Sequence, residues 1–410
     1  MDGGTGPPSV VGSGERSTGR PAGGPVGGGD GRRRRLAFWL SLGLGTMLLL
    51  AVGTVWLGYT KLNGNIHADT LTDRLLGPGS SRPTQVNSAQ NILIIGSDSR
   101  AGANAVYGAA VGARSDTTIL LHIAGDRRRA VAVSLPRDAV VDVPACTLPN
   151  GTVDPAYTGI FDSAFEKGGT ACTIRTVERL TDIRIDHFVV ADFTGFKKMV
   201  DAVGGVEVCL AQPVVDKDAE LDLPAGRQTL DGEQALGFVR ARYALGDGSD
   251  TQRMGRQQDF LSSLVRKVDS SGVLLNPTRL YPLLDAATSA LTVDPGLDSL
   301  SKLYDLTSSL SNLPAGRVTF LTAPREPYAH DRNRDQLKQP EADELFRQLR
   351  DDVPVTVAAA PTAPPSPGPV NANAAAALGP ALGSTAGSTV ASPAPRYSGR
   401  TAAQEVCAAP

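Results

Sequence analysis

The residues with the clearest chemical potential in this sequence are two aspartates beside predicted strands. Asp98 ends the apolar run Asn91–Asp98, and Asp116 directly precedes the apolar run Thr117–Ala124. If the two runs are neighbouring strands, both carboxylates lie at one edge of a sheet, where open α/β sheets usually bind ligands. Carboxylates that approach each other repel unless a cation lies between them, so the pair predicts a site for Mg²⁺ or Mn²⁺. The alternative is that both aspartates cap turns.

Three arginines at the ends of predicted elements form a second group. Arg137 follows a predicted strand, so a charged group again emerges at a strand end. Arg240 and Arg242 follow a helix whose predicted cap is Asp231. In an extended segment, residues two apart share a face, so both guanidinium groups would point the same way.

A further helix is predicted over Thr251–Val268, with Asp250 as its cap. Arg253, Arg256 and Gln257 follow one another at i, i+3 and i+4 and therefore share one face of it. Guanidinium groups that converge on a chain of net charge -2 need an anion, and their planar forks fit phosphate oxygens. The arginines as a set predict a phosphate site. For any single arginine, solvated surface is the alternative.

The elements that must position these groups alternate between strand and helix patterns. This alternation predicts an α/β fold, an α/β/α sandwich with a central mixed sheet. The predicted strands are Asn91–Asp98, Thr117–Ala124, Arg129–Leu135, Asp186–Phe193, Val206–Leu210 and Arg317–Leu321. Besides the helix after Asp231, the predicted helices are Phe161–Thr181, Thr194–Val203, Thr251–Val268, Pro277–Leu291, Leu300–Leu310 and Pro340–Arg350.

Other chemically active residues are predicted to be structural. His122 and His187 fall inside strand patterns and are expected to be packed. The hairpin tip Arg127–Arg129 is expected to be solvated. The sequence contains no G-x-S-x-G, P-loop or G-x-G-x-x-G motif, so serine hydrolases and nucleotide-cofactor enzymes lack support. The net charge of -2 excludes a globally basic nucleic-acid binder.

One segment is predicted to cross a membrane. Leu36–Tyr59 contains no charged residue and would form a helix of about 36 Å, enough for a hydrocarbon core of ~30 Å. Arg32–Arg35 precede it, and the positive-inside rule puts the N-terminus in the cytoplasm and the chain after Lys61 outside. A cleaved signal peptide is the alternative, but the run is longer than a usual h-region and no A-x-A site follows closely.

The 410 residues therefore divide by composition. Residues 1–35 and 353–410, rich in Gly, Pro, Ala and Ser, are predicted to be disordered ends. Residues 36–59 form the transmembrane helix, 60–90 a polar stem, and 91–352 the folded extracytoplasmic domain.

A disulfide is predicted between Cys146 and Cys172, since both lie in the part expected outside the cell, where disulfides persist. Cys209 lies in a strand pattern and Cys407 in the tail, so two free thiols are expected to remain. The alternative is that Cys146 and Cys172 are also free.

Five separated runs, in this order, resemble the LytR–CpsA–Psr family of cell-wall glycopolymer phosphotransferases, in its actinobacterial form. They cover roughly 91–268. The runs are NILIIGSDSR (Asn91–Arg100), ARSDTTILLHI (Ala113–Ile123), VAVSLPRD (Val131–Asp138), DHFVVADFTGFKKMVDAVGGVEV (Asp186–Val208), and LDGEQALGFVRARY with DTQRMGRQQ (Leu230–Tyr243, Asp250–Gln258).

The resemblance implies a divalent-metal-dependent enzyme outside the membrane. Such enzymes move a glycopolymer, for example a teichoic acid or an arabinogalactan-like polymer, from a polyprenyl-diphosphate carrier onto peptidoglycan. By motif position, the metal ligands are Asp98 and Asp116, the catalytic residues are Asp98, Asp116, Arg137 and Asp250, and the substrate-binding residues are Arg100, Arg114, Arg240, Arg242, Arg253 and Gln257. One departure is a family Lys-x-Asn-x-Ala-Tyr run, whose counterpart Ile160–Phe165 lacks the lysine.

Two other functions fit the same residues. A hydrolase that cleaves polyprenyl diphosphates without an acceptor needs the same metal and arginines. A non-catalytic lipid- or wall-binding module would bind the substrate and leave it unchanged. The products formed from a lipid-linked substrate distinguish the three.

Overall fold

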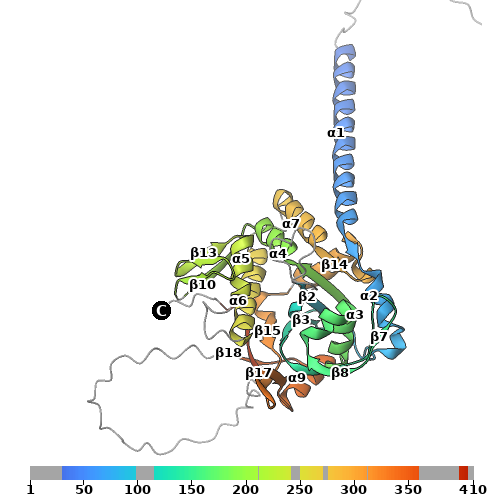
Figure 1. Ribbon diagram of the computed structural model, residues 1–410. Helices are drawn as coiled ribbons and strands as arrows, with labels where there is room; N and C mark the ends of the chain where they lie inside the picture. The colour runs from blue at the N-terminus through green and yellow to red at the C-terminus, as the bar shows by residue number, and fades with distance from the viewer. Residues whose placement is uncertain are drawn as a thin grey trace, which may run out of the picture. The chain divides into compact units, whose positions relative to one another are not determined.

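A computed structural model describes residues 30–97, 115–210, 212–241, 250–270, 276–311, 313–359 and 397–404 (Figure 1). The chain forms two units, 1–58 and 59–410, of which the second is the folded domain. Helix α1 (Asp30–Asn65) begins in the first unit, and its residues from Tyr59 on belong to the second. Among the described residues, one helix is long and apolar enough to cross a membrane, at Arg32–Asn65 with a mean hydropathy of 2.0.

The domain is built on a nine-stranded mixed sheet in the order β1-β14-β9-β2-β3-β4-β15-β19-β18. Strand β3 is antiparallel to its neighbours β2 and β4, whereas β2 is parallel to β9 and β4 is parallel to β15. The strands are β1 (His67–Ala68), β2 (Gln90–Ser97), β3 (Ser115–Ile123), β4 (Ala130–Leu135), β9 (His187–Asp192), β14 (Leu291–Val293), β15 (Val318–Thr322), β18 (Val357–Ala359) and β19 (Tyr397–Thr401).

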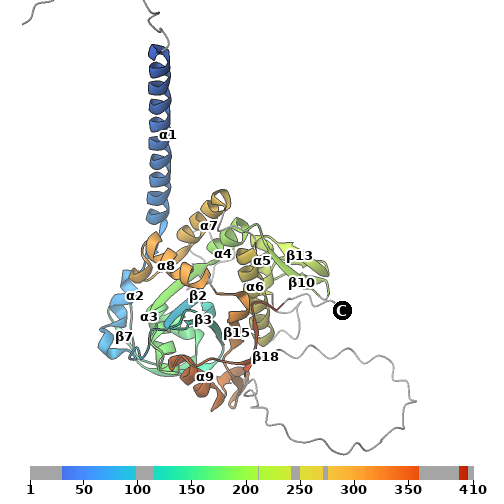
Figure 2. The same ribbon diagram turned by 180° about the vertical axis from the view of Figure 1, so that it is seen from behind.

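Helices cover both faces of this sheet, which confirms the predicted sandwich (Figures 1 and 2). On one face, Leu93 and Leu120 of the sheet pack in one core with residues of α2 (Thr70–Leu76), α3 (Asp162–Thr181) and α9 (Glu341–Arg350). On the other face, Ile119 and Phe320 pack against α6 (Asp250–Ser270). Alternate residues of each strand therefore point to opposite layers.

A second core lies beside the sheet. It joins α4 (Phe193–Ala202), α5 (Gly232–Arg240) and α6 to the antiparallel strand pairs β10–β13 (Val206–Leu210, Gly226–Leu230) and β11–β12 (Val214–Asp216, Leu221–Leu223). The remaining elements are α7 (Pro277–Ala290), α8 (Leu300–Ser311) and the strand pairs β5–β8 (Val140–Val143, Tyr157–Ile160), β6–β7 (Cys146–Thr147, Val153–Asp154) and β16–β17 (Arg325–Tyr328, Asp331–Leu337).

Local sequence signals fixed several element ends as predicted. Asp231 and Gln234 form a capping box at the start of α5, which satisfies amides that the first helical turn cannot bond. Gly204 and Gly205, with φ of 78° and 82°, end the segment after α4 because few other residues adopt this conformation. His122 is buried between Asn91 and Asp352, and burial lowers its pKa, which agrees with a packing role.

The segment 60–90 differs from the expected stem. Leu62 and Leu76 are each 4% exposed in the domain, and β1 pairs in parallel with β14. Arg82 forms an ion pair with the buried Glu178 of α3. Apolar contacts, strand pairing and ion pairs hold the segment against the domain, although its overall composition is polar.

The segment after residue 352 also differs from the expected tail in two places. Strand β19 pairs with β15, and β18 pairs with β19, so both extend the main sheet. Close pairing requires a glycine at Gly399, because a Cβ there would lie 2.5 Å from the carbonyl oxygen of Phe320. Arg266 of α6 donates hydrogen bonds to the carbonyls of Ala402 and Gln404. Residues 30–35 were also predicted to be disordered but belong to helix α1. The predicted disorder of residues 1–29, 360–396 and 405–410 lies outside the described residues.

The hairpin tip is less solvated than expected. Arg129 donates to the carboxylate of Asp352 at 2.6 Å and is 22% exposed. Arg127 is also partly buried, with a φ of 56°. The arginine run predicts a charged turn, but not that Asp352 would fold back onto it.

Candidate active site

Strand direction brings one set of residues to a single edge of the sheet. Ser97, at the end of β2, lies beside Asp192 at the end of β9 and opposite Ser115 at the start of β3. Because β4 and β15 run parallel to β2, their last residues and Arg137, two residues after β4, reach the same edge. This is the edge at which ligands bind in open α/β sheets.

Asp116 owes its position to a β-bulge. Gly96 pairs with Thr117 and Ser97 pairs with Ser115, so Asp116 is the extra residue on β3. Bulges commonly redirect a side chain next to a functional site. The Oδ1 atom of Asp116 accepts a hydrogen bond from Nη1 of Arg137 at 2.5 Å, and the two side chains are 28% and 15% exposed. The predicted catalytic residues Asp116 and Arg137 are thus in direct contact.

Arg137 is held from several sides. Its Nε lies 3.5 Å from the carboxylate of Asp138, which also pairs with Arg334 of β17 at 3.2 Å. Its backbone carbonyl accepts a hydrogen bond from the amide of Asp162 at 3.0 Å. These contacts fix the guanidinium at the strand end, where a planar fork can bind phosphate oxygens.

Asp162, the first residue of α3, is a site residue that the sequence reading missed. It is 7% exposed, and its Oδ1 accepts hydrogen bonds from the amide of Ser115 at 2.9 Å and from its hydroxyl at 3.3 Å. Burial raises the pKa of Asp162, while the Ser115 amide and the charge of Arg137 lower it and the charge of Asp116 raises it. Asp162 therefore holds the residue just before the bulge and shares the electrostatic field of the Asp116–Arg137 pair.

Arg240 was predicted to follow the helix in an extended segment, but it is the last residue of α5. It lies near the end of β9. Its guanidinium carbon is 4.9 Å from the centre of the Phe193 ring, a cation–π contact. Phe193 directly follows Asp192, which caps α4 by accepting from the amide of Gly195 at 2.7 Å. The contact holds the Arg240 side chain over the first residue of α4, beside the sheet edge.

Helix α6 reaches the same region through the hydrogen bonds of its glutamines. Arg253 is 4% exposed and Gln257 is 9% exposed, one turn apart on this helix. Gln257 donates to the carbonyl of Val239, next to Arg240, at 3.3 Å. The adjacent Gln258 donates to the hydroxyls of Ser134 in β4 and Thr322 in β15, at 3.1 and 2.9 Å. Hydrogen bonds thus tie α6 to the ends of the two strands that lead to the site.

One of the three residues on the predicted anion-binding face of α6 has a structural role. Arg256 shares that face, but it donates to the carbonyl of Ala241, just after α5. It therefore helps to fix the end of α5. Asp250, predicted to cap a helix that begins at Thr251, is instead the first residue of α6, and its side chain lies outside the described residues. The predicted residues Asp98, Arg100, Arg114 and Arg242 also lie outside the described residues.

A profile of the LytR_cpsA_psr family matches residues 59–351. The chain belongs to this family. The probable cell wall biosynthesis protein LcpB of Corynebacterium glutamicum is 38% identical over 285 residues, which cover 66% of this chain and 64% of LcpB. The polyisoprenyl-teichoic acid–peptidoglycan teichoic acid transferase TagU of Oceanobacillus iheyensis is 31% identical over 280 residues, 66% of this chain and 81% of that protein.

A solved structure supports the fold. Protein gbs0355 of Streptococcus agalactiae superposes with a TM-score of 0.54 at 19% identity, over 65% of this chain and 88% of that one. The family match begins at residue 59, so the segment predicted as a stem is part of the family domain. It also includes the described site residues Asp116, Arg137, Asp162 and Arg240.

The departure seen in the run Ile160–Phe165 now has a structural context. The run joins β8 to α3, and its third residue is Asp162. A carboxylate, bonded to Ser115, therefore occupies the segment in which the sequence resemblance suggested a lysine. The sequence signal that could have identified Asp162 is an aspartate that follows a short strand and begins a helix. The same pattern is expected of an ordinary helix cap, so it does not by itself indicate a site residue.

Of the two predicted metal ligands, Asp98 and Asp116, only Asp116 lies among the described residues. Asp116 offers hard carboxylate oxygens, and its Oδ1 is bonded to Arg137. In the described ranges, no group of three or more His, Cys, Asp or Glu side chains is placed to hold a metal ion. Asp116 is thus compatible with one ligand of a site whose other predicted ligand lies outside the described residues.

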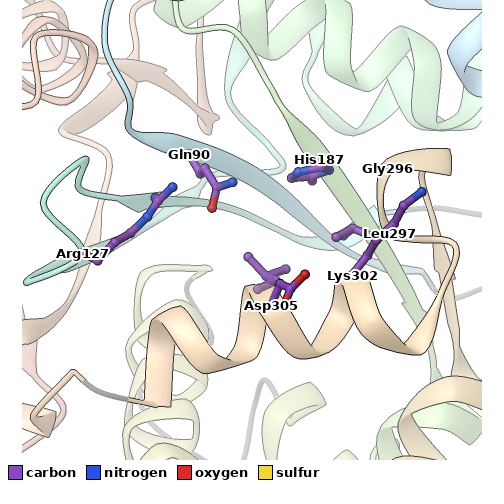
Figure 3. Close-up of a pocket in the computed structure, with 8 residues that line it drawn as sticks. Gln90, Arg127, His187, Gly296, Leu297, Lys302 and Asp305 are labelled. Atoms are coloured by element: carbon purple, nitrogen blue, oxygen red, sulfur yellow. The ribbon is translucent and has the colours of Figure 1, made fainter. Parts of the chain in front are cut away.

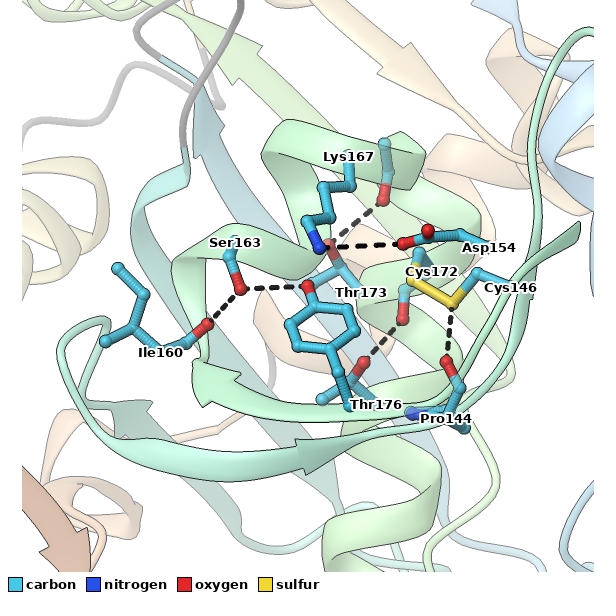
Figure 4. The surroundings of a disulfide bond; sticks show 11 residues. Pro144, Cys146, Asp154, Ile160, Ser163, Lys167, Cys172, Thr173 and Thr176 are labelled. Carbon is cyan, nitrogen blue, oxygen red and sulfur yellow. Dashed lines mark hydrogen bonds and ion pairs between the residues drawn. A yellow bond between two sulfur atoms is a disulfide. The ribbon is translucent and has the colours of Figure 1, made fainter.

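A disulfide joins strand β6 to helix α3 (Figure 4). Cys146 and Cys172 are bonded, with their Cα atoms 5.4 Å apart, which confirms the prediction. Around the bond, Tyr157 and Ser163 are hydrogen-bonded at 2.9 Å, and Nζ of Lys167 lies 3.7 Å from the centre of the Tyr157 ring. The expectation of two free thiols was wrong, because Cys209 is also disulfide-bonded and no described cysteine is free.

A pocket at the opposite edge of the sheet contains none of the predicted site residues (Figure 3). It lies between Gln90 and His187 of the sheet and α8, with Arg127 at one side. His187 Nδ1 is 3.1 Å from Asp294, and this hydrogen bond raises the pKa of His187. His187 has the structural role predicted for it.

Proposed function

We propose that this protein transfers a glycopolymer phosphate from a polyprenyl-diphosphate carrier to peptidoglycan outside the membrane. The observation that carries the proposal is the Asp116–Arg137 pair, which lies at the same sheet edge as Arg240 and α6 with its buried Arg253. Family membership and the transferase name of TagU support the choice of reaction. The match covers only 64% of the length of LcpB, so the identity of the glycopolymer that this protein transfers is also part of the proposal.

The chemistry follows from the charges at this edge. A diphosphate carries several negative charges, and the guanidinium groups of Arg137, Arg240 and Arg253 neutralise them and orient the phosphorus atoms. A sugar hydroxyl of peptidoglycan attacks the phosphorus next to the glycan, and a new P–O bond forms. The bond between this phosphorus and the bridging oxygen breaks, and polyprenyl phosphate leaves with that oxygen. The hydroxyl proton passes to a basic group or water at the site.

Mg²⁺ or Mn²⁺, with Asp98 and Asp116 as protein ligands, is the second part of the proposal. Such an ion would add Lewis-acid neutralisation of the diphosphate oxygens to that supplied by the arginines. The support is the hard-oxygen chemistry of Asp116 at the site edge. Removing divalent ions with a chelator should abolish transfer, and Mg²⁺ or Mn²⁺ should restore it, whereas full activity in the chelator would refute this part.

We also propose a single-pass membrane anchor with the N-terminus in the cytoplasm and the domain outside. The apolar helix Arg32–Asn65 and the arginines at its start support this orientation. An outside location also agrees with the disulfide between Cys146 and Cys172. A reporter fused after residue 352 should be active only if it works outside the cytoplasm.

Variants of the full chain in detergent micelles test the site. Arg240→Ala should weaken binding of a polyprenyl diphosphate that carries a short glycan by about 10- to 100-fold, because it removes a charge-assisted hydrogen bond worth roughly 1.5–3 kcal/mol. Arg137→Lys should restore less than half of the transfer lost in Arg137→Ala, since an ammonium lacks the planar fork. The control is Arg227→Ala, because Arg227 is 55% exposed and pairs with Glu207 on β10.

The rival explanation is that these arginines only stabilise the fold. It predicts that Arg240→Ala melts several degrees lower and binds the lipid diphosphate as tightly as the unmodified protein. That outcome would refute the site assignment. Weakened binding with an unchanged melting temperature supports it.

A further inference from the structure

Helix α7 runs beside the last residues of α1 within the folded domain. Nζ of Lys61 lies 3.1 Å from Oδ1 of Asp285 and 5.7 Å from the centre of the Tyr281 ring. One turn further on, Asn65 donates to Asp285 at 3.0 Å and to Thr288 at 3.5 Å. From Lys61 to Asn65 in α1, the contacts in α7 also move toward its C-terminus, from Tyr281 to Thr288. The two helices therefore run in the same direction, and Tyr281 lies level with Lys61.

Lys61 marks a depth relative to the membrane. It is the first charged residue after the uncharged run Leu36–Thr60. A lysine directly after a spanning segment places its ammonium at the membrane surface. Because α7 and α1 share a direction, the residues of α7 before Tyr281 extend toward the membrane side of Lys61.

The first half of α7 has the surface expected of a segment in that position. Tyr281 is 39% exposed, Pro282 and Thr278 are also exposed, and Leu280 and Leu284 are half-buried. Between residues 277 and 284 the only charged residue in the sequence is a cation, Arg279. Tyrosine prefers the membrane interface, because its ring is apolar and its hydroxyl can bond to headgroups or water.

We infer that the first half of α7, residues 278–284, inserts into the headgroup region of the membrane that α1 spans, with Tyr281 as its anchor. The inference rests on the proposed membrane anchor. Helices that bind in this way bury an apolar face at the boundary between headgroups and acyl chains, and anionic lipids attract their cations. A second contact restricts the orientation of the domain at the membrane surface, so the active site meets its lipid-linked substrate in a fixed orientation.

Tryptophan fluorescence of the full chain in anionic phospholipid vesicles tests this contact. The chain contains two tryptophans, Trp39 and Trp56, both within α1. In a background with Trp39→Phe and Trp56→Phe, the Tyr281→Trp variant reports on α7. The matched control is Tyr328→Trp on β16, in the same background. A third protein carries only Trp39→Phe, so that Trp56 reports on the span.

We expect the emission of the Tyr281→Trp variant to be blue-shifted and to lose intensity when the vesicles contain lipids brominated near the headgroup end of the acyl chains. The Tyr328→Trp control should show neither change. If Trp56 is quenched but the Tyr281→Trp variant is not, the anchor stands and the second contact is refuted. If Trp56 is also unquenched, the proposed anchor fails. A blue shift without quenching would mean that protein covers Tyr281, which also overturns the inference.

Discussion

Two substitutions of Asp162 distinguish the effect of its charge on stability from the effect of its hydrogen bond to Ser115. The amide of Ser115 donates to Oδ1 of Asp162 at 2.9 Å. In Asp162→Asn, a side-chain oxygen remains as its acceptor and only the charge is lost. In Asp162→Ala, the amide of Ser115, a residue with 0% exposure, loses its acceptor. An unsatisfied buried amide costs about 1–3 kcal/mol, so the alanine variant should be less stable than the asparagine variant by that amount.

The pH dependence of stability follows from the direction of the pKa shift. Burial raises the pKa of Asp162 above its ordinary value, so the folded state binds this proton more tightly than the unfolded state. The contribution of Asp162 to the free energy of unfolding therefore falls as the pH rises from the ordinary aspartate pKa, about 4, through the raised pKa. Above that window it stays constant. The asparagine variant lacks this titration.

Urea unfolding of the full chain in micelles, at several pH values from the ordinary aspartate range to neutral, measures both effects. The difference in free energy of unfolding, unmodified protein minus Asp162→Asn, should decrease as the pH rises and then level. If the difference increases with pH, the ionised carboxylate stabilises the fold and the assigned cause of the pKa shift is wrong.

Three further predictions concern the disulfides and His187. Replacing Cys146 and Cys172 by alanine opens a loop of 26 residues and should lower the free energy of unfolding by about 3.5 kcal/mol in the loop-entropy account, as measured by urea titration. Thiol counting on denatured, unreduced protein should find no free cysteine, and a peptide map should link Cys209 to Cys407, the fourth cysteine of the chain; two free thiols would contradict this. His187→Gln should lower the melting temperature most at acidic pH, where the imidazolium is charged, and less as the pH rises through the raised pKa of His187; a loss that grows with pH would refute the Asp294 contact as its cause.

The sequence alone was enough to predict that Asp116 and Arg137 lie at strand ends. The strand after Asp116 and the strand before Arg137 are short apolar runs with charged residues at their ends, and this pattern depends only on local chain chemistry. The sequence analysis assumed that the two apolar runs are neighbouring strands, and β2 and β3 do pair. The contact between Asp116 and Arg137 did not follow, because it depends on the bulge opposite Gly96 and Ser97.

The parts that differed depend on contacts between residues distant in sequence. Tyr397–Thr401 lies in a segment of low complexity and becomes a strand only because β15 offers an edge that it can pair with. The segment around Leu76 is polar on average, and its few apolar residues gain stability only once they reach the domain core. Asp162 resembles an ordinary helix cap, and its role depends on Ser115, 47 residues earlier.

The central claim is that the edge with Asp116 and Arg137 transfers a phosphate-linked polymer and does not merely release it. The decisive measurement uses a radiolabelled glycan on a polyprenyl diphosphate, incubated with the full chain and peptidoglycan, followed by separation of all products. The account predicts label on peptidoglycan together with an equal amount of polyprenyl phosphate, and loss of both in Arg137→Ala. Label that appears only as free glycan phosphate in the presence of peptidoglycan would identify a hydrolase, and an unchanged substrate would identify a binding module; either result would contradict the account.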